Sequence, residues 1–487
     1  MHKKVFFSKV LQMALIMAVF NISNLCFGIF VSNRLGAEQT GLFHLIMNVQ
    51  SIGISLSVSG MSLTATRLLS DMARERALIC SDHIVGKCLR ICLATSVSAA
   101  AVMMCASDFI ASSLLARPNA APMLRALAPA LVCVAVSAVL GGYFTAFGKV
   151  GAIGTGRLMG EAASWIYIAF AACSADRCIE CTDVVAANVA AALVQCFCDV
   201  WLWRKSARTH GSQKSSVSTR HVIALCAPLA IGSYLRTGLS SAENLLIPSR
   251  LGASGVADSL AQYGIIKGMS MPVLFFPSVA VGAFVSLIVP EIARRRAQCQ
   301  PNSIRYISVL SAQYILRFGF LVSAIFFVWS DEICGYVYSR AEAGVYLRML
   351  SVLPLFMFFD SACDAILKGL DEQVFGLKVN IADAAMRVLL ILLCVPIWGI
   401  RGYICILYTS EILNLALSYW RLKKITALRF PLAKAVMIPL FAIWCSLGAV
   451  NLIGASNALS QILIFAAAYI SITSLASPIF SRHKTDC

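Results

Sequence analysis

Apolar side chains fill long runs of this chain, and short polar segments separate the runs. About fourteen runs approach roughly 20 residues, the length that an α-helix needs to cross a bilayer core. Their centres lie near residues 20, 54, 96, 135, 162, 193, 234, 274, 317, 357, 386, 411, 442 and 469. The runs are too long for the alternating strands of a membrane β-barrel, which span about 10 residues each. Because lipid cannot satisfy free backbone groups, the pattern predicts an all-α polytopic membrane protein with about fourteen transmembrane helices.

The composition agrees with this interpretation. Hydrophobic residues make up 59% of the 487 residues, charged residues make up 13%, and the mean hydropathy is +0.81. Soluble domains contain about 25% charged residues, so most of this surface is expected to face lipid. The first run follows "MHKK" and lacks an Ala-x-Ala cleavage site. We therefore expect an uncleaved first helix rather than a signal peptide.

Basic residues gather in alternate loops, and this predicts the orientation. Segments 67–77, 204–220 and 421–429 are basic, whereas 174–183 and 331–334 lean acidic. The positive-inside rule makes the basic loops cytoplasmic. The basic residues at the two termini join that side, so both termini are predicted to be cytoplasmic. Dispersed charge that follows topology accounts for the net charge of +17 without a nucleic-acid partner.

The sequence repeats itself after six predicted helices. Arg-Leu-Gly-Ala closes the first run at 34–37 and the seventh at 250–253. Segment 127–151 also aligns with 350–376, again six runs apart. In this second alignment Pro129 matches Pro354, and Gly142 matches Gly369. An even separation makes both halves enter the membrane in the same direction, which predicts two parallel repeats.

The repeat divides the chain into four predicted parts. We expect an N-terminal six-helix bundle over 1–203, a basic cytoplasmic linker over 204–220, a second six-helix bundle over 221–425, and two additional transmembrane helices over 426–487. The linker is rich in Ser and Lys, which is typical of a flexible, solvated segment. Parallel repeats joined by short loops favour alternating access at the repeat interface.

The motifs of enzymes, metal sites and cofactor sites are not found in the sequence. There is no GxxxxGK[ST] phosphate loop and no HExxH. The Gly-rich segment 151–160 lacks GxGxxG spacing and opens an apolar run, so its small residues predict close helix packing. Cys178 and Cys181 form one CxxC pair without a second. A disulfide or half a metal site stays open there, but plain cysteines are the favoured interpretation.

Charged residues inside apolar runs are costly and normally face protein or water, so they are the candidate functional residues. The second half contains most of them: Arg236, Glu243, Lys267, Arg317, Asp360, Asp364, Asp383, Arg387 and Glu411. The first half offers fewer polar candidates: Glu161, Asp199, Asn21, Asn24 and Asn48. Asp360 and Asp364 are four residues apart, as are Asp383 and Arg387, so each pair shares one helix face.

Two interpretations of these charges stay open. In the first they form internal ion pairs, Asp383 with Arg387, and Arg236 or Lys267 with a carboxylate of the tenth run. In the second, Arg236 and Lys267 line one central cavity and bind a diphosphate, because the Arg fork binds oxygens bidentately and Lys adds a point charge. Each would lie about 15 residues from Leu251, or about 22 Å along its helix. Five residues would then balance charge or couple transport to an ion: Glu243, Asp360, Asp364, Asp383 and Arg387.

Several stretches resemble a known family. These are 261–295, 346–380, 399–422 and "RLGAEQTGLFHLI" at 34–46. They are similar to the stage V sporulation protein B group of polysaccharide flippases, within the multidrug/oligosaccharidyl-lipid/polysaccharide (MOP) exporter superfamily. The resemblance implies two six-helix bundles in a V with a central cavity, and two added C-terminal helices. It also implies a bacterial cytoplasmic membrane protein that flips an undecaprenyl-diphosphate-linked saccharide or peptidoglycan precursor.

The expected partners are the lipid-linked saccharide, membrane lipids and a coupling H⁺ or Na⁺, and we expect a monomer. Two alternatives remain. One is a cation-coupled multidrug antiporter of the same superfamily, with Asp360 and Asp364 as ion sites. The other is a non-transporting scaffold for an envelope-synthesis complex.

Overall fold

The protein is represented by a computed structural model, in which every described element is a helix. The structure describes residues 2–58, 60–74, 81–174, 179–207, 218–255, 258–340, 342–426, 430 and 432–475. Cys178, most of the predicted 204–220 linker and the basic residues near the C-terminus lie outside the described residues.

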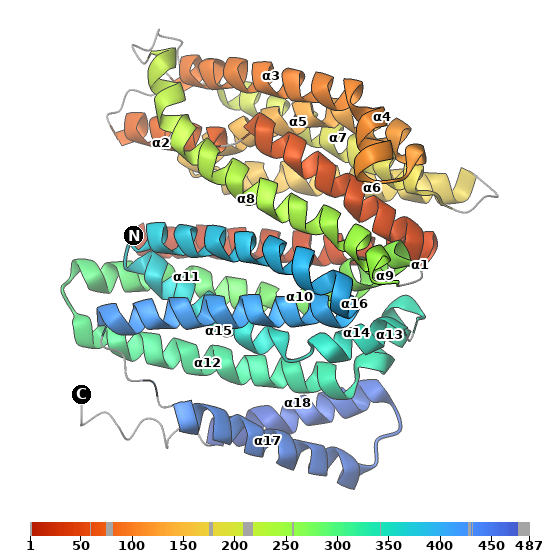
Figure 1. The fold of residues 1–487 in the computed structure, drawn as a ribbon. Helices are drawn as coiled ribbons and strands as arrows, with labels where there is room; N and C mark the ends of the chain where they lie inside the picture. Colours follow the sequence, from red (N-terminus) through yellow and green to blue (C-terminus); the bar gives the residue numbers. More distant parts are fainter. Residues whose placement is uncertain are drawn as a thin grey trace. The chain divides into compact units, whose positions relative to one another are not determined.

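The helices follow one another along the chain (Figure 1). The first half contains α1 (His2–Val58), α2 (Met61–Arg74), α3 (Ser81–Cys105), α4 (Ser107–Phe109), η2 (Ile110–Leu114), η3 (Pro118–Ala120), α5 (Ala121–Ala146), α6 (Val150–Ser174) and α7 (Cys181–Ala207). The second contains α8 (Thr219–Ala253), α9 (Ser259–Ile265), η4 (Ile266–Ser270), α10 (Met271–Phe275), α11 (Ser278–Ala297), α12 (Pro301–Val328), α13 (Ser330–Tyr338), α14 (Glu342–Leu350), α15 (Leu353–Gly369), α16 (Gln373–Thr426), α17 (Leu432–Ile453) and α18 (Ala458–Leu475).

Many of these helices are long and apolar enough to cross a membrane. Among the described residues eight qualify, or up to eleven if each bent pair counts as one span. Helix α1 has 57 residues and α16 has 54, or roughly 80–85 Å each at 1.5 Å per residue. Each is kinked at a glycine with positive φ, Gly36 at 78° and Gly399 at 55°. The all-α, multi-pass membrane fold is confirmed, and the count of about fourteen spans stays a prediction.

The glycines in the Arg-Leu-Gly-Ala regions end or break helices. Gly36 lies within the first motif and makes the kink of α1. The second motif forms the last turn of α8, and Gly255 follows with φ of 79°. Left-handed backbone is the conformation that glycine adopts at little cost. The repeated motif therefore marks the place where a long helix stops or turns in each half.

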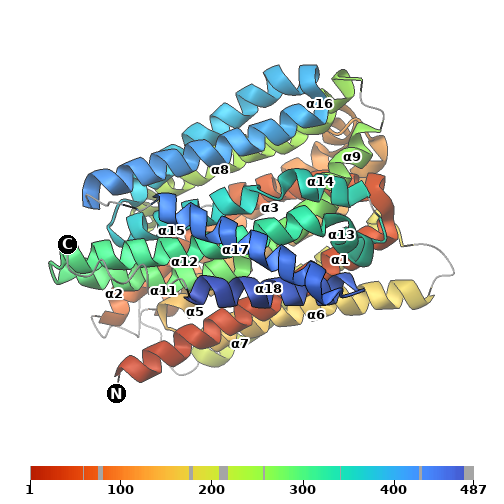
Figure 2. The same ribbon diagram turned by 90° about the horizontal axis from the view of Figure 1, so that it is seen from below.

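The described chain divides into two compact units. Unit 1 is Met1–Ser249 with Ala257–Gly264, and unit 2 is Arg250–Val256 with Ile265–Cys487. In unit 1, α5 packs against α1, α2, α3 and α7. The C-terminal end of α5, which we predict to lie on the cytoplasmic side, is buried in a hydrophobic cluster. This cluster includes Tyr143, Phe144, Ala65 and Leu69. In unit 2, α15 packs against α11, α12 and α16, and the α17–α18 hairpin packs against α12 (Figure 2).

The same glycine contact occurs once in each unit. A Cβ added at Gly142 would lie 2.5 Å from the Ser62 carbonyl oxygen and 3.2 Å from Ala65 Cβ. A Cβ at Gly369 would lie 3.0 Å from the Val289 carbonyl oxygen and 2.7 Å from Ile292 Cβ. In both units the glycine therefore lets two helices approach to backbone contact, as Gly commonly does in membrane helices.

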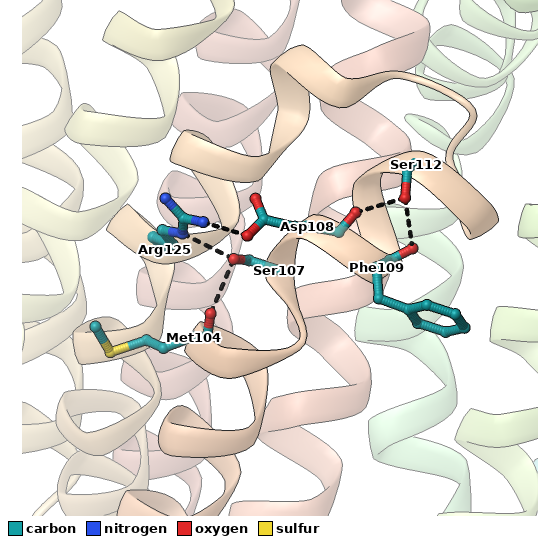
Figure 3. A network of polar contacts seen from close by, with 6 residues as sticks. All are labelled: Met104, Ser107, Asp108, Phe109, Ser112 and Arg125. Carbon is teal, nitrogen blue, oxygen red and sulfur yellow. Dashed lines mark hydrogen bonds and ion pairs between the residues drawn. The ribbon is translucent and has the colours of Figure 1, made fainter.

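A polar clasp is also repeated. In unit 1, Arg125 Nη2 lies 2.5 Å from Asp108 Oδ2, and Arg125 Nε donates to Ser107 Oγ at 2.8 Å (Figure 3). In unit 2, Arg348 makes the corresponding contacts with Asp331 and Ser330, at 2.5 Å and 3.1 Å. The partners are 17 and 18 residues apart in both halves. These repeated contacts support the duplication predicted from the sequence.

The Gly142 contact gives a stability prediction with a built-in control. Replacing Gly142 with Ala is expected to destabilise the protein by about 1–3 kcal/mol, because the methyl group has no room beside the Ser62 carbonyl. Gly141 has nothing within 4 Å of its Cβ position, so Gly141→Ala is expected to be neutral or stabilising by up to about 1 kcal/mol. Thermal unfolding of the detergent-purified variants measures the difference. Equal unfolding temperatures for the two variants would contradict the packing argument.

Candidate functional site

An acidic network in unit 2 joins α15 to both arms of the kinked helix α16. Asp360 and Asp364 lie on α15, Asp383 and Arg387 lie before the Gly399 kink, and Glu411 lies after it. Glu411 interacts electrostatically with Asp360, Asp383 and Arg387. The network thus brings together most of the acidic residues that the sequence predicted for charge balance or coupling.

Asp383 is the most buried member, with 3% of its surface exposed. It lies 3.2 Å from Arg387 Nε through Oδ2, and its Oδ1 accepts a hydrogen bond from Ser410 Oγ at 2.6 Å. The ion pair with Arg387 is the one that the i,i+4 spacing predicted. Because both oxygens of Asp383 have a partner, this buried carboxylate is well satisfied.

The two carboxylates of α15 are less completely satisfied. Asp364 accepts a hydrogen bond from Ser418 Oγ at 3.4 Å and lies 3.9 Å from Lys368 Nζ. Asp360 Oδ1 is buried without a hydrogen-bond partner among the described residues. A buried acceptor that lacks a donor is costly, so within the acidic network this oxygen is the candidate to receive a proton or a cation.

Lys267 lies in a short π-helical turn. In η4, Ile266, Gly268, Met269 and Ser270 are buried, and only Lys267 is partly exposed. Its Nζ lies 5.8 Å from the centre of the Tyr403 ring, within the range of a cation–π contact. Within the described part of unit 2, Lys267 forms no ion pair. Its predicted pairing with a carboxylate of the tenth run is therefore not seen. The contact that Lys267 makes instead is the cation–π contact with the Tyr403 ring.

The structure corrects the predicted position of Lys267 along its helix. The residue count assumed a continuous path from Leu251, but α8 ends at Ala253 and α9 begins at Ser259. Lys267 therefore lies eight residues into its helix, or about 12 Å rather than about 22 Å from the end. The residues between Ala253 and Ser259 lie outside both helices, so they do not add to the distance of Lys267 from the start of its helix.

Arg236 and Glu243 both lie in the part of α8 that belongs to unit 1. Arg236 is exposed and has no ion pair within the described residues of that unit, whereas Glu243 is buried, with 3% exposure. A polar seam flanks Glu243: Asn48 Nδ2 donates to the Ser241 carbonyl at 3.1 Å. Because Arg236 and Lys267 belong to different units, each of which is described by itself, their shared cavity stays a prediction.

The first-half carboxylates serve helix packing. Ser23 Oγ donates to Glu161 Oε1 at 3.1 Å, and Trp165 Nε1 donates to Ser23 Oγ at 3.1 Å, which ties α6 to α1. Asp199 is buried on α7, and a Cβ at Gly156 would lie 2.2 Å from its Oδ1. The glycine at 156 thus makes room for the carboxylate. This agrees with the sequence interpretation of 151–160 as a packing segment.

Arg317 has a structural role at the last two helices. Its Nη1 donates to the Thr473 carbonyl of α18 at 3.2 Å, and Tyr469 Oη donates to the Arg317 carbonyl at 2.9 Å. Trp329 Nε1 also donates to Gln461 Oε1 at 2.8 Å. These contacts hold α18 against α12 and give Arg317 a structural role.

Sequence reasoning missed the polar partners of the acidic network. Ser410, Asn414 and Ser418 repeat every four residues in "SEILNLALS", which places them on one face of the helix. Ser410 and Ser418 contact Asp383 and Asp364, and Asn414 Oδ1 is buried without a hydrogen bond. This period-four polar stripe in an apolar run was the available signal. Among the described residues, no group of three or more His, Cys, Asp or Glu residues could hold a metal ion.

Comparisons with known proteins show which sequences and folds this chain resembles. No protein-family profile matches the chain. Stage V sporulation protein B of Bacillus subtilis (strain 168) is 20% identical over 404 residues, which cover 79% of this chain and 77% of that protein. The lipid II flippase MurJ in an inward closed conformation has a similar fold, with a TM-score of 0.72 and 12% identity over 96% of this chain and 100% of that one.

A third relative is an inward-facing multidrug resistance MATE family transporter of the MOP superfamily. Its TM-score is 0.68, with 16% identity over 86% of this chain and 98% of that one. This chain has the helical membrane fold of these transporters. Its sequence is similar to stage V sporulation protein B, as the resemblance in 261–295, 346–380 and 399–422 predicted.

Proposed function

We propose that this protein is a MOP-superfamily flippase for an undecaprenyl-diphosphate-linked saccharide or peptidoglycan precursor. It would move this lipid across the bacterial cytoplasmic membrane by alternating access. The fold that it shares with a lipid II flippase over 96% of the chain, and its relation to stage V sporulation protein B, support the proposal. The coupling ion would be H⁺ or Na⁺, and the termini would be cytoplasmic.

The observation that carries the proposal is the state of Lys267. Burying an ammonium inside an apolar run costs free energy unless an anion pairs with it. Within unit 2, Lys267 forms no ion pair, although several carboxylates are present in the same unit, and its Nζ lies over the Tyr403 ring. A cation without an acidic partner among the described residues of its own unit is suited to an anionic headgroup. Arg236, exposed on α8, is the second predicted diphosphate contact.

Native mass spectrometry of the purified protein tests the substrate class. We expect binding of undecaprenyl diphosphate in preference to undecaprenyl monophosphate, because each charge-assisted contact to the added phosphate contributes about 1.5–3 kcal/mol. Lys267→Ala is expected to remove this preference. The control is Lys424→Ala, which removes an exposed cation that lies over Trp420. Equal binding of both lipids by the parental protein would contradict the proposal.

A specific observation favours a second candidate, the cation-coupled multidrug antiporter. Asp360 Oδ1 is buried without a hydrogen-bond partner in the acidic network, which is suited to binding a proton or Na⁺. Proteoliposomes separate the two functions. An antiporter would export a cationic drug against an ion gradient, would lose this activity in Asp360→Asn and would keep it in Lys267→Ala. The flippase predicts the opposite dependence on Lys267.

A further inference from the structure

The π-turn that contains Lys267 is supported by a buried hydrogen bond to a neighbouring helix. Ser270, the last residue of η4, is 0% exposed, and its Oγ donates to the Ala343 carbonyl at 2.9 Å. Ala343 belongs to the first turn of α14, and η4 packs against both α13 and α14. The single hydroxyl of Ser270 therefore connects the turn to the helix pair beside it.

The polar clasp holds the accepting carbonyl in place. Arg348, on α14, bonds Asp331 and Ser330 at the start of α13. Gly344, the residue after Ala343, packs onto the same Asp331, because a Cβ at this position would lie 2.5 Å from Asp331 Oδ1. The start of α14 is thus fixed to the start of α13 by a side-chain clasp and a backbone contact. Both lie within a few residues of the Ala343 carbonyl.

The first half has an equivalent clasp, but it lacks the counterpart of the π-turn with the Ser270 hydrogen bond. Gly41 and Gly264 both follow an Arg-Leu-Gly-Ala motif, and each packs on the other: a Cβ at either would lie within 3.2 Å of the other's backbone nitrogen. Aligning the chain from these glycines puts Met47 opposite Ser270. Helix α1 stays α-helical there, and a thioether cannot donate a hydrogen bond.

We propose that Ser270 and the Arg348–Asp331 clasp are positioning residues, which hold the π-turn and thereby fix the Lys267 ammonium for the substrate diphosphate. A π-turn is an unfavourable local geometry that often marks functional sites, and it persists when its surroundings determine it. In unit 2 the π-turn is held by the Ser270–Ala343 hydrogen bond and by the clasp of Arg348. The role of the held lysine in substrate binding rests on the proposed function, whereas the support of the turn does not.

The test combines amide hydrogen exchange with native mass spectrometry on the full chain, with undecaprenyl diphosphate as the probe. The variants are Ser270→Ala, Ser270→Thr and Arg348→Ala, with Arg125→Ala as the matched control because it breaks the equivalent clasp of the first half. Ser270→Ala and Arg348→Ala are expected to raise exchange in peptide 265–272 about tenfold and to weaken probe binding roughly fivefold to tenfold. Ser270→Thr keeps the hydroxyl and is expected to behave like the parent, as is Arg125→Ala.

The two readouts separate the inference from the proposed function. Parental exchange in peptide 265–272 for both Ser270→Ala and Arg348→Ala would overturn the inference, whatever the binding result. An equal rise in Arg125→Ala would also overturn it, because the effect would then be general loosening. Raised exchange together with unchanged probe binding, in these variants and in Lys267→Ala, would overturn the proposed role of Lys267 and leave the support of the turn established.

Discussion

Replacing Lys267 with Ala is expected to reduce flipping of the lipid-linked substrate about 100-fold, while the amount of protein inserted in the membrane stays at the parental level. The ammonium has no protein acid as a partner within unit 2, so its removal takes a charged contact from the substrate and only the cation–π contact with Tyr403 from the fold. A charge-assisted contact of about 3 kcal/mol corresponds to this factor. Flipping of a fluorescent lipid-linked substrate in proteoliposomes measures it.

Charge and geometry are separated by conservative variants. Lys267→Arg keeps the charge and is expected to retain part of the activity. Arg236→Ala is expected to abolish flipping, and Arg236→Lys to retain only part of it, because the bidentate fork is lost. Lys424→Ala, which removes an exposed cation at the end of α16, serves as the control and is expected to flip at the parental rate. If Lys267→Ala and Arg236→Ala both flipped the substrate at the parental rate, the diphosphate contacts would lie elsewhere.

Replacing Arg387 with Leu is expected to destabilise the protein by about 3–5 kcal/mol, because it leaves the carboxylate of Asp383 buried without its cation. Asp383 is 3% exposed and lies 3.2 Å from Arg387 Nε. Its remaining hydrogen bond from Ser410 does not neutralise the charge. Unfolding in detergent, followed by the loss of tertiary signal with increasing denaturant, measures the change.

A compensating variant makes this result specific. Asp383→Asn in the Arg387→Leu background removes the uncompensated charge and is expected to recover most of the lost stability, since an amide can still accept from Ser410. Arg421→Ala breaks a more exposed pair with Glu372, at 2.8 Å, and is expected to cost about 1 kcal/mol or less. A double variant no more stable than Arg387→Leu alone would show that the ion pair is not the cause.

The features that the sequence predicted correctly are local or periodic. Runs of roughly 20 apolar residues determine a helical membrane protein, because each run must satisfy its own backbone in lipid. The Asp383–Arg387 pair follows from a spacing of four residues on one helix. The repeated motif at 34–37 and 250–253 marked the duplication because glycine is needed where a helix kinks or ends. All of these depend on neighbours within a turn or two of the chain.

The tertiary structure alone decided which distant residues meet. The clasps join residues 17 and 18 positions apart across a helix corner, and Ser270 bonds a carbonyl 73 positions away. The π-turn at Lys267 also came only from the fold, because η4 packs against α13 and α14, and the shortened path follows from the start of α9 at Ser259. In a chain with so few charges, an apolar run permits many helix rotations of similar energy. Close glycine contacts and buried polar bonds then select one of them, and these form only when the helices are side by side.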